Sequence, residues 1–438
     1  MNKPLCVVSC PIDTFSGYGA RSRDFVRSLI KEKGEECNIK ILAQRWGDCP
    51  LGFLKKDDKL HQHIIPNLTS KPDIWFQITV PNEFQPVGTY NVGVTAGIET
   101  TLFSGEFLEG MNRMDLNLVS SEHSKKVAQS TQLEKKNQQG QSVGIVKCEK
   151  PVEVLFEGLN LDTYFKKPLK SNILKDVNED FCLLFTGHWL SGDFGHDRKN
   201  VATLIRTFLR TFKGSSKNKP ALILKSNRVN YSLLDREDIL VGINRIKNSD
   251  EFKGEKLPNI YLLHGEMTDE EMNQLNNDPK VKVFTSFTKG EGFGRPLLEQ
   301  AITGKPVLTT NWSGHIDFLH PDYNILIGGE LENVHPSSAN QFLLKESQWF
   351  KINEDIASRA MKDVFKHYKK YLEKSRKQTQ YIKDNWTFDK MGEKLNSLLP
   401  TIEAAPQMQS LKLPKLKKVG KSPTLPKLKL PKLKKVEA

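Results

Sequence analysis

The residues with the clearest chemical potential lie in one short segment, which reads GEGFGRPLLEQA from Gly290 to Ala301. Its glycines allow a backbone to approach a ligand closely, and Pro296 is a favoured residue at the first position of a helix. The unpaired N–H groups at a helix N-terminus, together with the helix dipole, suit a diphosphate. We therefore predict a glycine-rich loop that leads into a helix over residues 296–303 and binds an anion there.

Two carboxylates accompany this predicted anion site. Glu291 lies on the loop, and Glu299 lies about one turn into the predicted helix. Carboxylates are poor ligands for phosphate and good acceptors for the hydroxyl groups of sugars. The pair indicates a sugar and a ribose attached to the phosphates. The alternative interpretation is an ordinary strand–turn–helix with a glycine-rich turn.

This segment resembles the E-x7-E motif of the retaining glycosyltransferases of family 4, which have the GT-B fold. Glu291 and Glu299 stand at the two glutamate positions, and residues 312–319 also fit the family. The resemblance implies that Glu291 contacts the donor sugar and that Glu299 contacts the ribose of the nucleotide. It further implies donor binding by the rest of the motif, namely Gly292, Phe293, Gly294, Arg295, Pro296 and Leu297.

A basic pair, Arg198 and Lys199, follows the first strand expected in the second half of the chain. In the family, a basic pair at this place neutralises the donor diphosphate, whose negative charge grows as the glycosidic bond breaks. Fixed cations in a closed cleft stabilise such developing charge. Many members have an arginine where this chain has His188, so we assign the catalytic roles to Glu291, Arg198 and Lys199. Lys225 is a further donor-binding candidate, and a solvated basic helix cap is the alternative for the pair.

Two features of the first half extend the resemblance, which covers roughly residues 5–400. Gly17 and Gly19 follow the first expected strand and are similar to the family's N-terminal glycine loop, although a plain β–α turn would look the same. Glu99 follows another strand and is our candidate for the acceptor side, where many members use a histidine. A loop or helix-capping acid is the alternative there. We expect His123 to belong to an ordinary capped helix start.

Strand-like and helix-like segments alternate along the chain, which is typical of parallel sheets with helices on both faces. We predict an α/β protein of the GT-B class, with two doubly wound Rossmann-like domains facing each other across a cleft and the ligand site at the carboxyl ends of the strands. The predicted parts are an N-terminal acceptor-side domain (1–170), a C-terminal nucleotide-sugar domain (171–384), a helix packing back on the first domain (385–402) and a disordered tail (403–438). We expect the polar segment 135–141 to be an exposed loop.

The basic charge of the 438-residue chain is concentrated in the tail. Residues 401–438 hold ten lysines against two glutamates, which accounts for +8 of the net charge of +13. The sequence LKLPKLKKV at Leu411–Val419 recurs at Leu428–Val436, and its prolines and mutually repelling lysines predict disorder. Such a tail suits an anionic membrane surface or nucleic acid, or simply keeps the protein soluble.

No metal or cofactor is expected. The sequence has no convincing DxD motif or His/Cys cluster, and Asp57-Asp58 falls in a lysine-rich loop. The six cysteines lack metal-site spacing and are predicted to be reduced and structural, which favours a cytoplasmic location, with peripheral attachment to a membrane as a further option. No run of eighteen apolar residues is present.

The expected reaction moves a sugar from a nucleotide diphosphate sugar to an acceptor hydroxyl on a polysaccharide, lipid or protein glycan, with retention and by front-face attack. Two alternatives remain open at this point. One is a GT-B-fold protein that binds nucleotide or sugar without catalysis, and the other is a protein that acts mainly by binding an anionic partner through its tail.

Overall fold

A computed structural model describes residues 3–136, 139–167, 172–190, 192, 194–216, 218–228 and 231–400. Residues Met1–Ala404 form one compact unit, separate from Ala405–Ala438. The predicted tail, residues 403–438 with the two repeats, lies outside the described residues. Within those residues, no helix is both long and apolar enough to cross a membrane.

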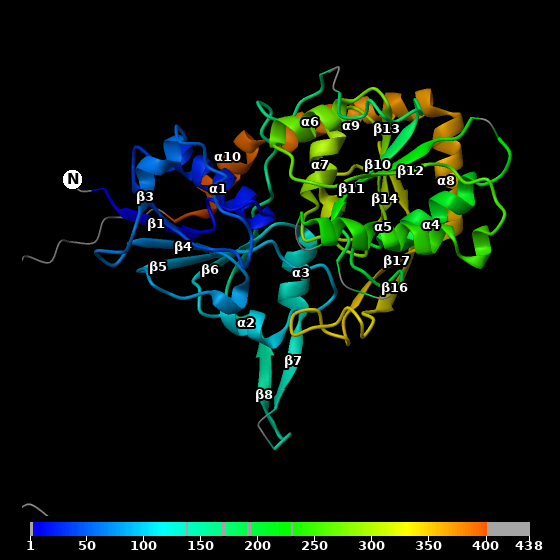
Figure 1. The fold of residues 1–438 in the computed structure, drawn as a ribbon. Helices are drawn as coiled ribbons and strands as arrows, with labels where there is room; N and C mark the ends of the chain where they lie inside the picture. The colour runs from blue at the N-terminus through cyan, green and yellow to red at the C-terminus, as the bar shows by residue number, and fades with distance from the viewer. Residues whose placement is uncertain are drawn as a thin grey trace, which may run out of the picture. The chain divides into compact units, whose positions relative to one another are not determined.

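The first half of the compact unit is built on a seven-stranded sheet of order β3-β2-β1-β4-β5-β6-β9, in which every paired strand is parallel to its neighbours (Figure 1). Helices α1, α2 and α3 lie in three of the crossover connections between these parallel strands. The strands are β1 (Leu5–Cys10), β2 (Asn38–Ala43), β3 (Ile64–Ile65), β4 (Ile74–Ile78), β5 (Tyr90–Val94), β6 (Leu116–Val119) and β9 (Val152–Val154), and the helices are α1 (Gly17–Lys33), α2 (Gly105–Met111) and α3 (Glu122–Ser130).

The second half repeats this plan with a six-stranded parallel sheet of order β12-β11-β10-β13-β14-β15. In each half the first strand of the sheet in chain order, β1 or β10, is an inner strand, and the following strands extend the sheet on both sides of it. The strand order therefore reverses beside this strand and opens a crevice there. The strands are β10 (Cys182–His188), β11 (Ala221–Asn227), β12 (Ile260–Leu263), β13 (Val281–Ser286), β14 (Val307–Thr310) and β15 (Ile325–Ile327), and the helices are α4 (Val201–Phe212), α5 (Leu233–Lys247), α6 (Asp269–Asn277) and α7 (Arg295–Ala301).

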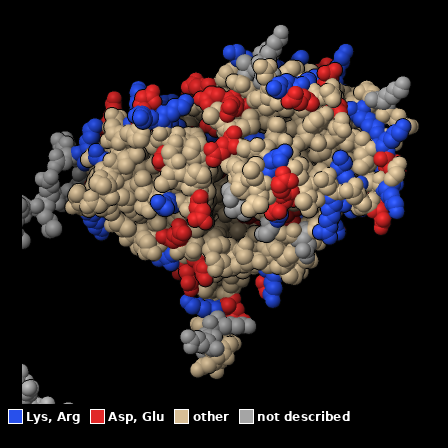
Figure 2. Space-filling model, viewed as in Figure 1, with Lys and Arg blue, Asp and Glu red and all other residues tan. Residues whose placement is uncertain are grey.

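Each sheet has an apolar core on both faces, which explains why its strands are almost continuously apolar. In β1, Val7 and Val8 point to opposite faces, and both are fully buried. In β10, Leu183 and Leu184 do the same in the second half. Acidic and basic side chains are interspersed over the visible surface of the described residues, in keeping with the modest charge outside the tail (Figure 2).

The chain returns to the first half at its C-terminal end. Helix α10 (Phe388–Leu398) places Met391 and Leu395 in the same core as Phe25 and Leu29 of α1. The sequence also predicts helical segments through residues 352–377, and two helices are present there, although the first does not begin at Ile352. Strand β17 (Gln348–Ile352) comes first, and His367 then separates α8 (Glu354–Lys366) from α9 (Tyr368–Asn385).

Two antiparallel hairpins are added to this frame. One is a hairpin of β7 (Gln132–Lys136) and β8 (Ser142–Lys147), which projects from the first half (Figure 1). Of the segment 135–141, predicted to be an exposed loop, residues 139–141 are an exposed turn as expected, whereas Lys135 and Lys136 belong to β7. The base of this hairpin is anchored because Leu133 and Val146 pack on the core of the first half. A second hairpin, β16 (Gly329–Asn333) with β17, follows β15 and was not predicted.

Candidate functional site

Four charged side chains from the two halves meet in one cluster. Glu99 follows β5 in the first half, Arg198 and Lys199 immediately precede α4, and Glu291 lies in the loop after β13. Lys199 Nζ lies 2.5 Å from Glu291 Oε1, and Arg198 Nη1 lies 3.3 Å from Glu291 Oε2. The same Arg198 nitrogen is 3.6 Å from Glu99 Oε1. The three residues assigned to catalysis and the acceptor-side candidate are therefore neighbours.

Burial makes the charges of this cluster interdependent. Burial by itself raises the pKa of the Glu291 carboxyl, but the adjacent Lys199 and Arg198 outweigh it and lower that pKa to about 2. Burial lowers the pKa of Lys199, while Glu291 opposes the change. Burial also acts to lower the pKa of Arg198, but Glu99 and Glu291 raise it on balance. Glu291 is thus a permanent carboxylate held by two cations.

The glycines of the loop serve contacts within the protein. A Cβ atom at Gly290 would lie 1.9 Å from the carbonyl oxygen of Glu99, and one at Gly292 would lie 2.0 Å from that of Ala96. Ser120 of the first half donates a hydrogen bond to the Gly292 carbonyl at 3.1 Å. The expectation that these glycines make room for a ligand is therefore incomplete, because they also let the backbones of the two halves touch.

Helix α7 starts one residue earlier than predicted and is shorter. Gly294, with φ of 98°, is its N-cap, and Pro296 lies in the first turn. The side chains of Phe293 and Leu297 belong to the apolar core of the second half, so a donor would reach these two residues through their backbone. Glu299 lies on the same helix with a carboxylate that is almost fully buried.

Arg295 is the shared ion-pair partner of Glu299 and of two acidic residues of the first half. Arg295 Nε donates to Glu299 Oε1 at 2.8 Å, and Arg295 Nη1 lies 2.6 Å from Asp24 Oδ2 and 3.6 Å from Glu157 Oε2. Burial raises the pKa of Glu299 to about 7, since Arg295 is divided among three carboxylates and Asp269 adds a further negative charge. The arginine predicted to bind the donor thus also ties α7 to α1.

The remaining predicted residues lie near the cluster with separate roles. Gly17 is exposed with open space around its Cα, whereas a Cβ atom at Gly19 would meet Thr14 oxygens at 2.3 and 2.6 Å. Lys225 on β11 is buried, and its Nζ donates to the Gly265 carbonyl at 2.5 Å. Burial lowers the pKa of Lys225. His123 lies in the first turn of α3 behind the capping Ser121, as expected.

Sequence reasoning missed two residues that touch this site. Trp312 follows β14, and its ring meets the ring of His123 edge-on at 4.8 Å between centroids. Ser313 comes next, and its Oγ accepts a hydrogen bond from the Glu291 N–H at 2.9 Å. Both lie in the stretch 312–319 that fits the family pattern, but only the folded chain brings that stretch against Glu291.

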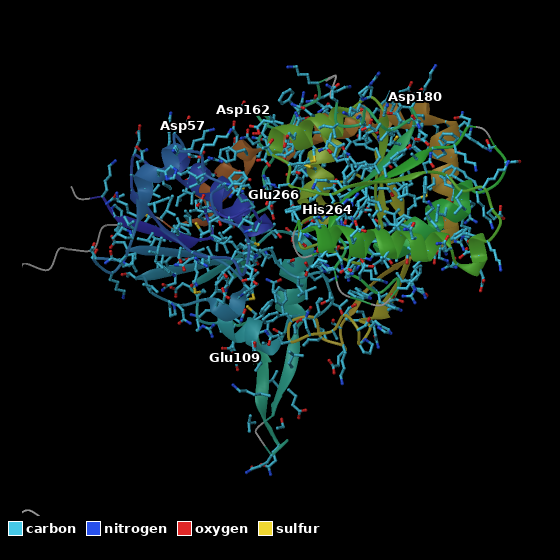
Figure 3. The ribbon with its side chains drawn as sticks, viewed as in Figure 1. Asp57, Glu109, Asp162, Asp180, His264 and Glu266 are labelled. Atoms are coloured by element: carbon cyan, nitrogen blue, oxygen red, sulfur yellow. The ribbon has the colours of Figure 1, made fainter. Side chains whose placement is uncertain are left out.

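An open cavity of about 370 Å³ lies between the two halves, and one of its lining residues, Asp269, is an acid whose negative charge acts on Glu299. The second half lines it with the segment Glu266–Glu271, and the first half with two aromatic and three charged side chains, namely Phe15, Phe53, Arg27, Lys55 and Asp58. Figure 3 labels Glu266, the first residue of this segment, and His264, which directly follows β12. Aromatic rings and carboxylates suit a planar, hydrogen-bonding group.

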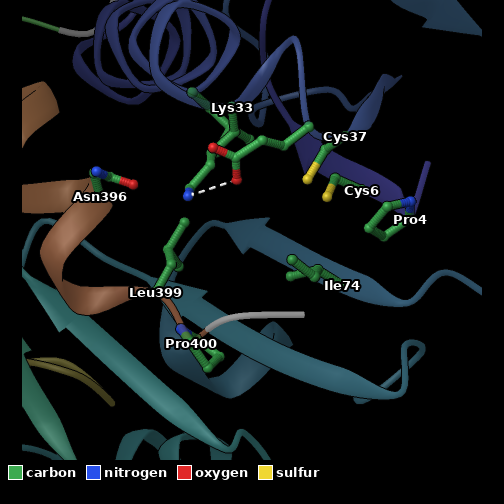
Figure 4. Close-up of a pocket in the computed structure, with 10 residues that line it drawn as sticks. Pro4, Cys6, Lys33, Cys37, Ile74, Asn396, Leu399 and Pro400 are labelled. Carbon is green, nitrogen blue, oxygen red and sulfur yellow. Dashed lines mark hydrogen bonds and ion pairs between the residues drawn. The ribbon is translucent and has the colours of Figure 1, made fainter. Parts of the chain in front are cut away.

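A second cavity, of about 250 Å³, lies at the other end of the first sheet and holds Cys6 and Cys37 (Figure 4). It opens beside the first residues of β1, whereas ligands in such sheets bind at the carboxyl ends of the strands. All six cysteines are free in the structure. In the described residues, no group of three or more His, Cys, Asp or Glu side chains is placed to hold a metal ion.

The two parallel sheets and the cleft between them define the GT-B fold, with two Rossmann-like domains, and solved structures share it. A glycosyltransferase from Rickettsia africae matches with a TM-score of 0.59 and 14% identity, covering 91% of this chain and 98% of that one. HepE of Anabaena, in complex with UDP and glucose, matches with a TM-score of 0.56 and 13% identity over 90% of this chain and 98% of its own. Sucrose-phosphate synthase from Thermosynechococcus elongatus matches with a TM-score of 0.56 and 9% identity, covering 91% of this chain and 98% of that one. No family model and no curated protein matches the sequence.

Proposed function

We propose that this protein is a glycosyltransferase that transfers a sugar from a nucleotide diphosphate sugar to an acceptor hydroxyl, with retention at the anomeric carbon. The observation that carries the proposal is the buried contact of Lys199 and Arg198 with Glu291, at the carboxyl ends of the strands and beside the first half. The GT-B fold supports it, since the HepE structures with that fold hold UDP or UDP-glucose.

Lys199 and Arg198 are proposed to bind the donor diphosphate. Both are cations in a largely buried setting, where their attraction for a leaving phosphate is stronger than in water. In the structure, the Glu291 carboxylate forms ion pairs with both cations. When the donor binds, its phosphates take over part of these contacts, and the Glu291 carboxylate becomes available to accept hydrogen bonds from sugar hydroxyls.

The nucleoside is proposed to occupy the cavity of about 370 Å³ between the halves, within the usual size range for ligand pockets. The exposed ring of Phe15 offers a face for a base, whereas Arg23 already covers one face of Phe53. Backbone and side-chain groups of Glu266–Glu271 offer hydrogen bonds to the edge of the base. Glu299 is then the acceptor for the ribose hydroxyls. Its link to the cavity is Asp269, which lines the cavity and whose charge contributes to raising the pKa of Glu299.

The reaction is proposed to proceed by front-face attack, in which the departing phosphate takes the proton of the acceptor hydroxyl. The protein then contributes positioning and charge stabilisation. Glu99 is proposed to orient the acceptor, because its side chain is about one-third exposed (30%) and its carboxylate reaches Arg198 from the first half. We further propose that Arg198 and Lys199 handle the diphosphate charge without a metal ion.

A ligand panel tests the donor site first. Thermal unfolding is measured with UDP, GDP, ADP and their common sugar conjugates, with and without EDTA, for the wild type, Lys199→Met and Lys351→Met. A ligand that binds only the native state raises the Tm according to its concentration relative to its Kd. Lys351 is a matched control because its side chain is 55% exposed and lies in β17, outside the proposed machinery.

We expect one base family to raise the Tm of the wild type and of Lys351→Met, with little or no shift in Lys199→Met, and EDTA to leave the shifts unchanged. The ligand that binds is then tested as a sugar donor by the release of free nucleoside diphosphate. Binding without release, under any acceptor, would indicate the non-catalytic alternative. No shift with any ligand would contradict the proposed donor site.

A further inference from the structure

Two residues of the described chain combine a side chain with a positive φ, and both border the charged cluster. Asn200, next to Lys199, has φ 54° and ψ 40°, a left-handed conformation that asparagine tolerates. Ser313 has φ 74° and ψ −159°, a region that is essentially restricted to glycine. A serine at this position therefore strains the backbone, and a glycine would not.

The Ser313 hydroxyl has a definite partner. Its Oγ accepts the Glu291 N–H at 2.9 Å, in a fully buried contact. The next residue, Gly314, donates its own N–H to the Glu291 carbonyl oxygen at 2.9 Å. Both peptide groups of Glu291 are thus bonded to consecutive residues of one turn. A glycine at position 313 would keep the second hydrogen bond and lose the first.

The turn lies directly on the glycine loop. A Cβ atom at Gly314 would lie 2.2 Å from the Gly292 carbonyl oxygen. The loop therefore has little freedom on this side, and the Ser313 hydroxyl fixes the one backbone N–H that belongs to Glu291 itself. A small displacement of that peptide group would move the carboxylate away from Lys199 and Arg198.

We infer that Ser313 is a positioning residue, whose strained backbone presents a hydroxyl that holds Glu291 between its two cations in the geometry needed to meet the donor sugar. The inference rests on the proposed function for its catalytic meaning. The structural part of the inference does not depend on that function. It states that the Ser313 hydroxyl anchors the Glu291 peptide group and that this contact requires a strained backbone at Ser313. Strain of this kind is characteristic of functional sites, where the surrounding structure enforces it.

A purely structural role would have a different consequence. If the hydroxyl only stabilised the turn, its loss would lower the Tm and leave the kcat of the folded protein unchanged. If the hydroxyl positions Glu291, Ser313→Gly should change kcat without changing the Tm to a similar extent. Relief of strain offsets the lost hydrogen bond, so stability is retained, while the misplaced carboxylate lowers kcat.

The test compares full-length wild type, Ser313→Gly and Ser313→Ala. Neither variant has the hydroxyl, but alanine keeps the strain and glycine removes it. We expect the Tm of Ser313→Gly to stay within about 3 °C of the wild type and that of Ser313→Ala to fall below it. In both variants kcat should fall by about 10- to 100-fold, with a smaller change in the KM for the donor.

Hydrogen exchange measured on peptides that cover Glu291 provides a readout that needs no activity. We expect its N–H to exchange faster in both variants than in the wild type. Wild-type kcat in Ser313→Gly, equal Tm values for the two variants, or unchanged exchange at Glu291 would each overturn the inference. If the wild type transfers no sugar, the proposed function fails, and the Tm order and the exchange rates still decide whether Ser313 anchors Glu291.

Discussion

Arg295 and Asp24 join the two halves of the chain through an ion pair of 2.6 Å between Nη1 and Oδ2. Arg295 is in the first turn of α7, directly after the glycine loop, and Asp24 is in the middle of α1. Because Arg295 also binds Glu299 at 2.8 Å, the carboxylate proposed for the ribose is linked to the first half through a shared cation. The position of the first half is therefore coupled to the charge of Glu299, a residue of the proposed donor site.

The first prediction concerns the pH dependence of stability and follows from Glu299. Its folded-state pKa of about 7 lies above the ordinary value of 4.5, so the folded protein binds more protons than the unfolded chain between these values. The contribution of Glu299 to the free energy of unfolding is then complete below pH 4.5 and is lost as the pH rises to 7. The loss amounts to at most about 3 kcal/mol.

Glu299→Gln removes this titration while keeping the shape of the side chain. We expect the variant to match the wild type in urea unfolding at pH 4.5 and to exceed it progressively up to pH 8. Asp197 and Asp317, whose pKa values burial raises to about 6, are present in both proteins and cancel in the comparison. A difference that does not change with pH would contradict the assigned pKa.

The second prediction concerns turnover. Glu291→Gln keeps the size of the side chain and removes the charge that Lys199 and Arg198 hold, and we expect kcat to fall by about 100-fold or more. Lys199→Met leaves Glu291 with Arg198 alone and should raise the donor KM as well as lower kcat. Initial rates with the donor found by the ligand panel give both constants, and circular dichroism checks the fold. Near-normal rates in both variants would refute the assignment.

The parallel sheets were predictable because their strands are apolar on both faces. The largely apolar runs Leu5–Cys10 and Ile260–Leu263 each form a strand of a parallel sheet. The two hairpins were harder to predict, since β7 is polar and exposed along most of its length, and its pairing with β8 depends on contacts outside the segment. Similarly, His367 divides a stretch whose helical periodicity continues on both sides.

The candidate site was predictable where it depends on one continuous segment, as for Glu291 and Glu299. Its three-dimensional partners were not. Ser313 lies 22 positions from Glu291, and no local pattern shows that its hydroxyl faces that peptide group. The close approach of Gly290 to the Glu99 carbonyl could also not be predicted, because it involves the backbone of the other half. Contacts of this kind depend on tertiary packing, which a local pattern does not contain.

The third prediction concerns Lys289, the buried residue that directly precedes the glycine loop. Its side chain is 2% exposed, and its Nζ lies 2.5 Å from Glu332 Oε1 of the hairpin β16–β17. Its backbone N–H donates to the Arg198 carbonyl at 2.7 Å, and its own carbonyl accepts from Phe350 at 2.9 Å. Lys289 therefore contacts the basic loop and the hairpin through its backbone, and its side chain adds an ion pair with the hairpin.

Removal of the two partners should have unequal effects. Glu332→Ala leaves the Lys289 charge buried without its carboxylate, which we expect to lower the free energy of unfolding by about 3–5 kcal/mol. Lys289→Met should be much milder, because it buries an apolar side chain and leaves a carboxylate that water can reach. Lys351→Met is the control, since Lys351 is exposed and lies 3.8 Å from the same Glu332, so a change of less than about 1 kcal/mol is expected. Urea unfolding measures all three, and equal effects of Glu332→Ala and Lys289→Met would argue against a buried charge.

The fourth prediction separates the compact unit from the tail. A chain ending at Ala404 retains the whole compact unit, including all the residues of the proposed site, and loses the ten lysines of the two repeats and their linker. If transfer is the function of the compact unit, the truncated chain should keep the Tm shift with the donor and the kcat of the full chain on a soluble acceptor. Binding to anionic vesicles or nucleic acid should weaken, most strongly at low salt, because the lysines supply electrostatic attraction. Loss of donor turnover on truncation, with the Tm unchanged, would instead assign the tail a part in the reaction.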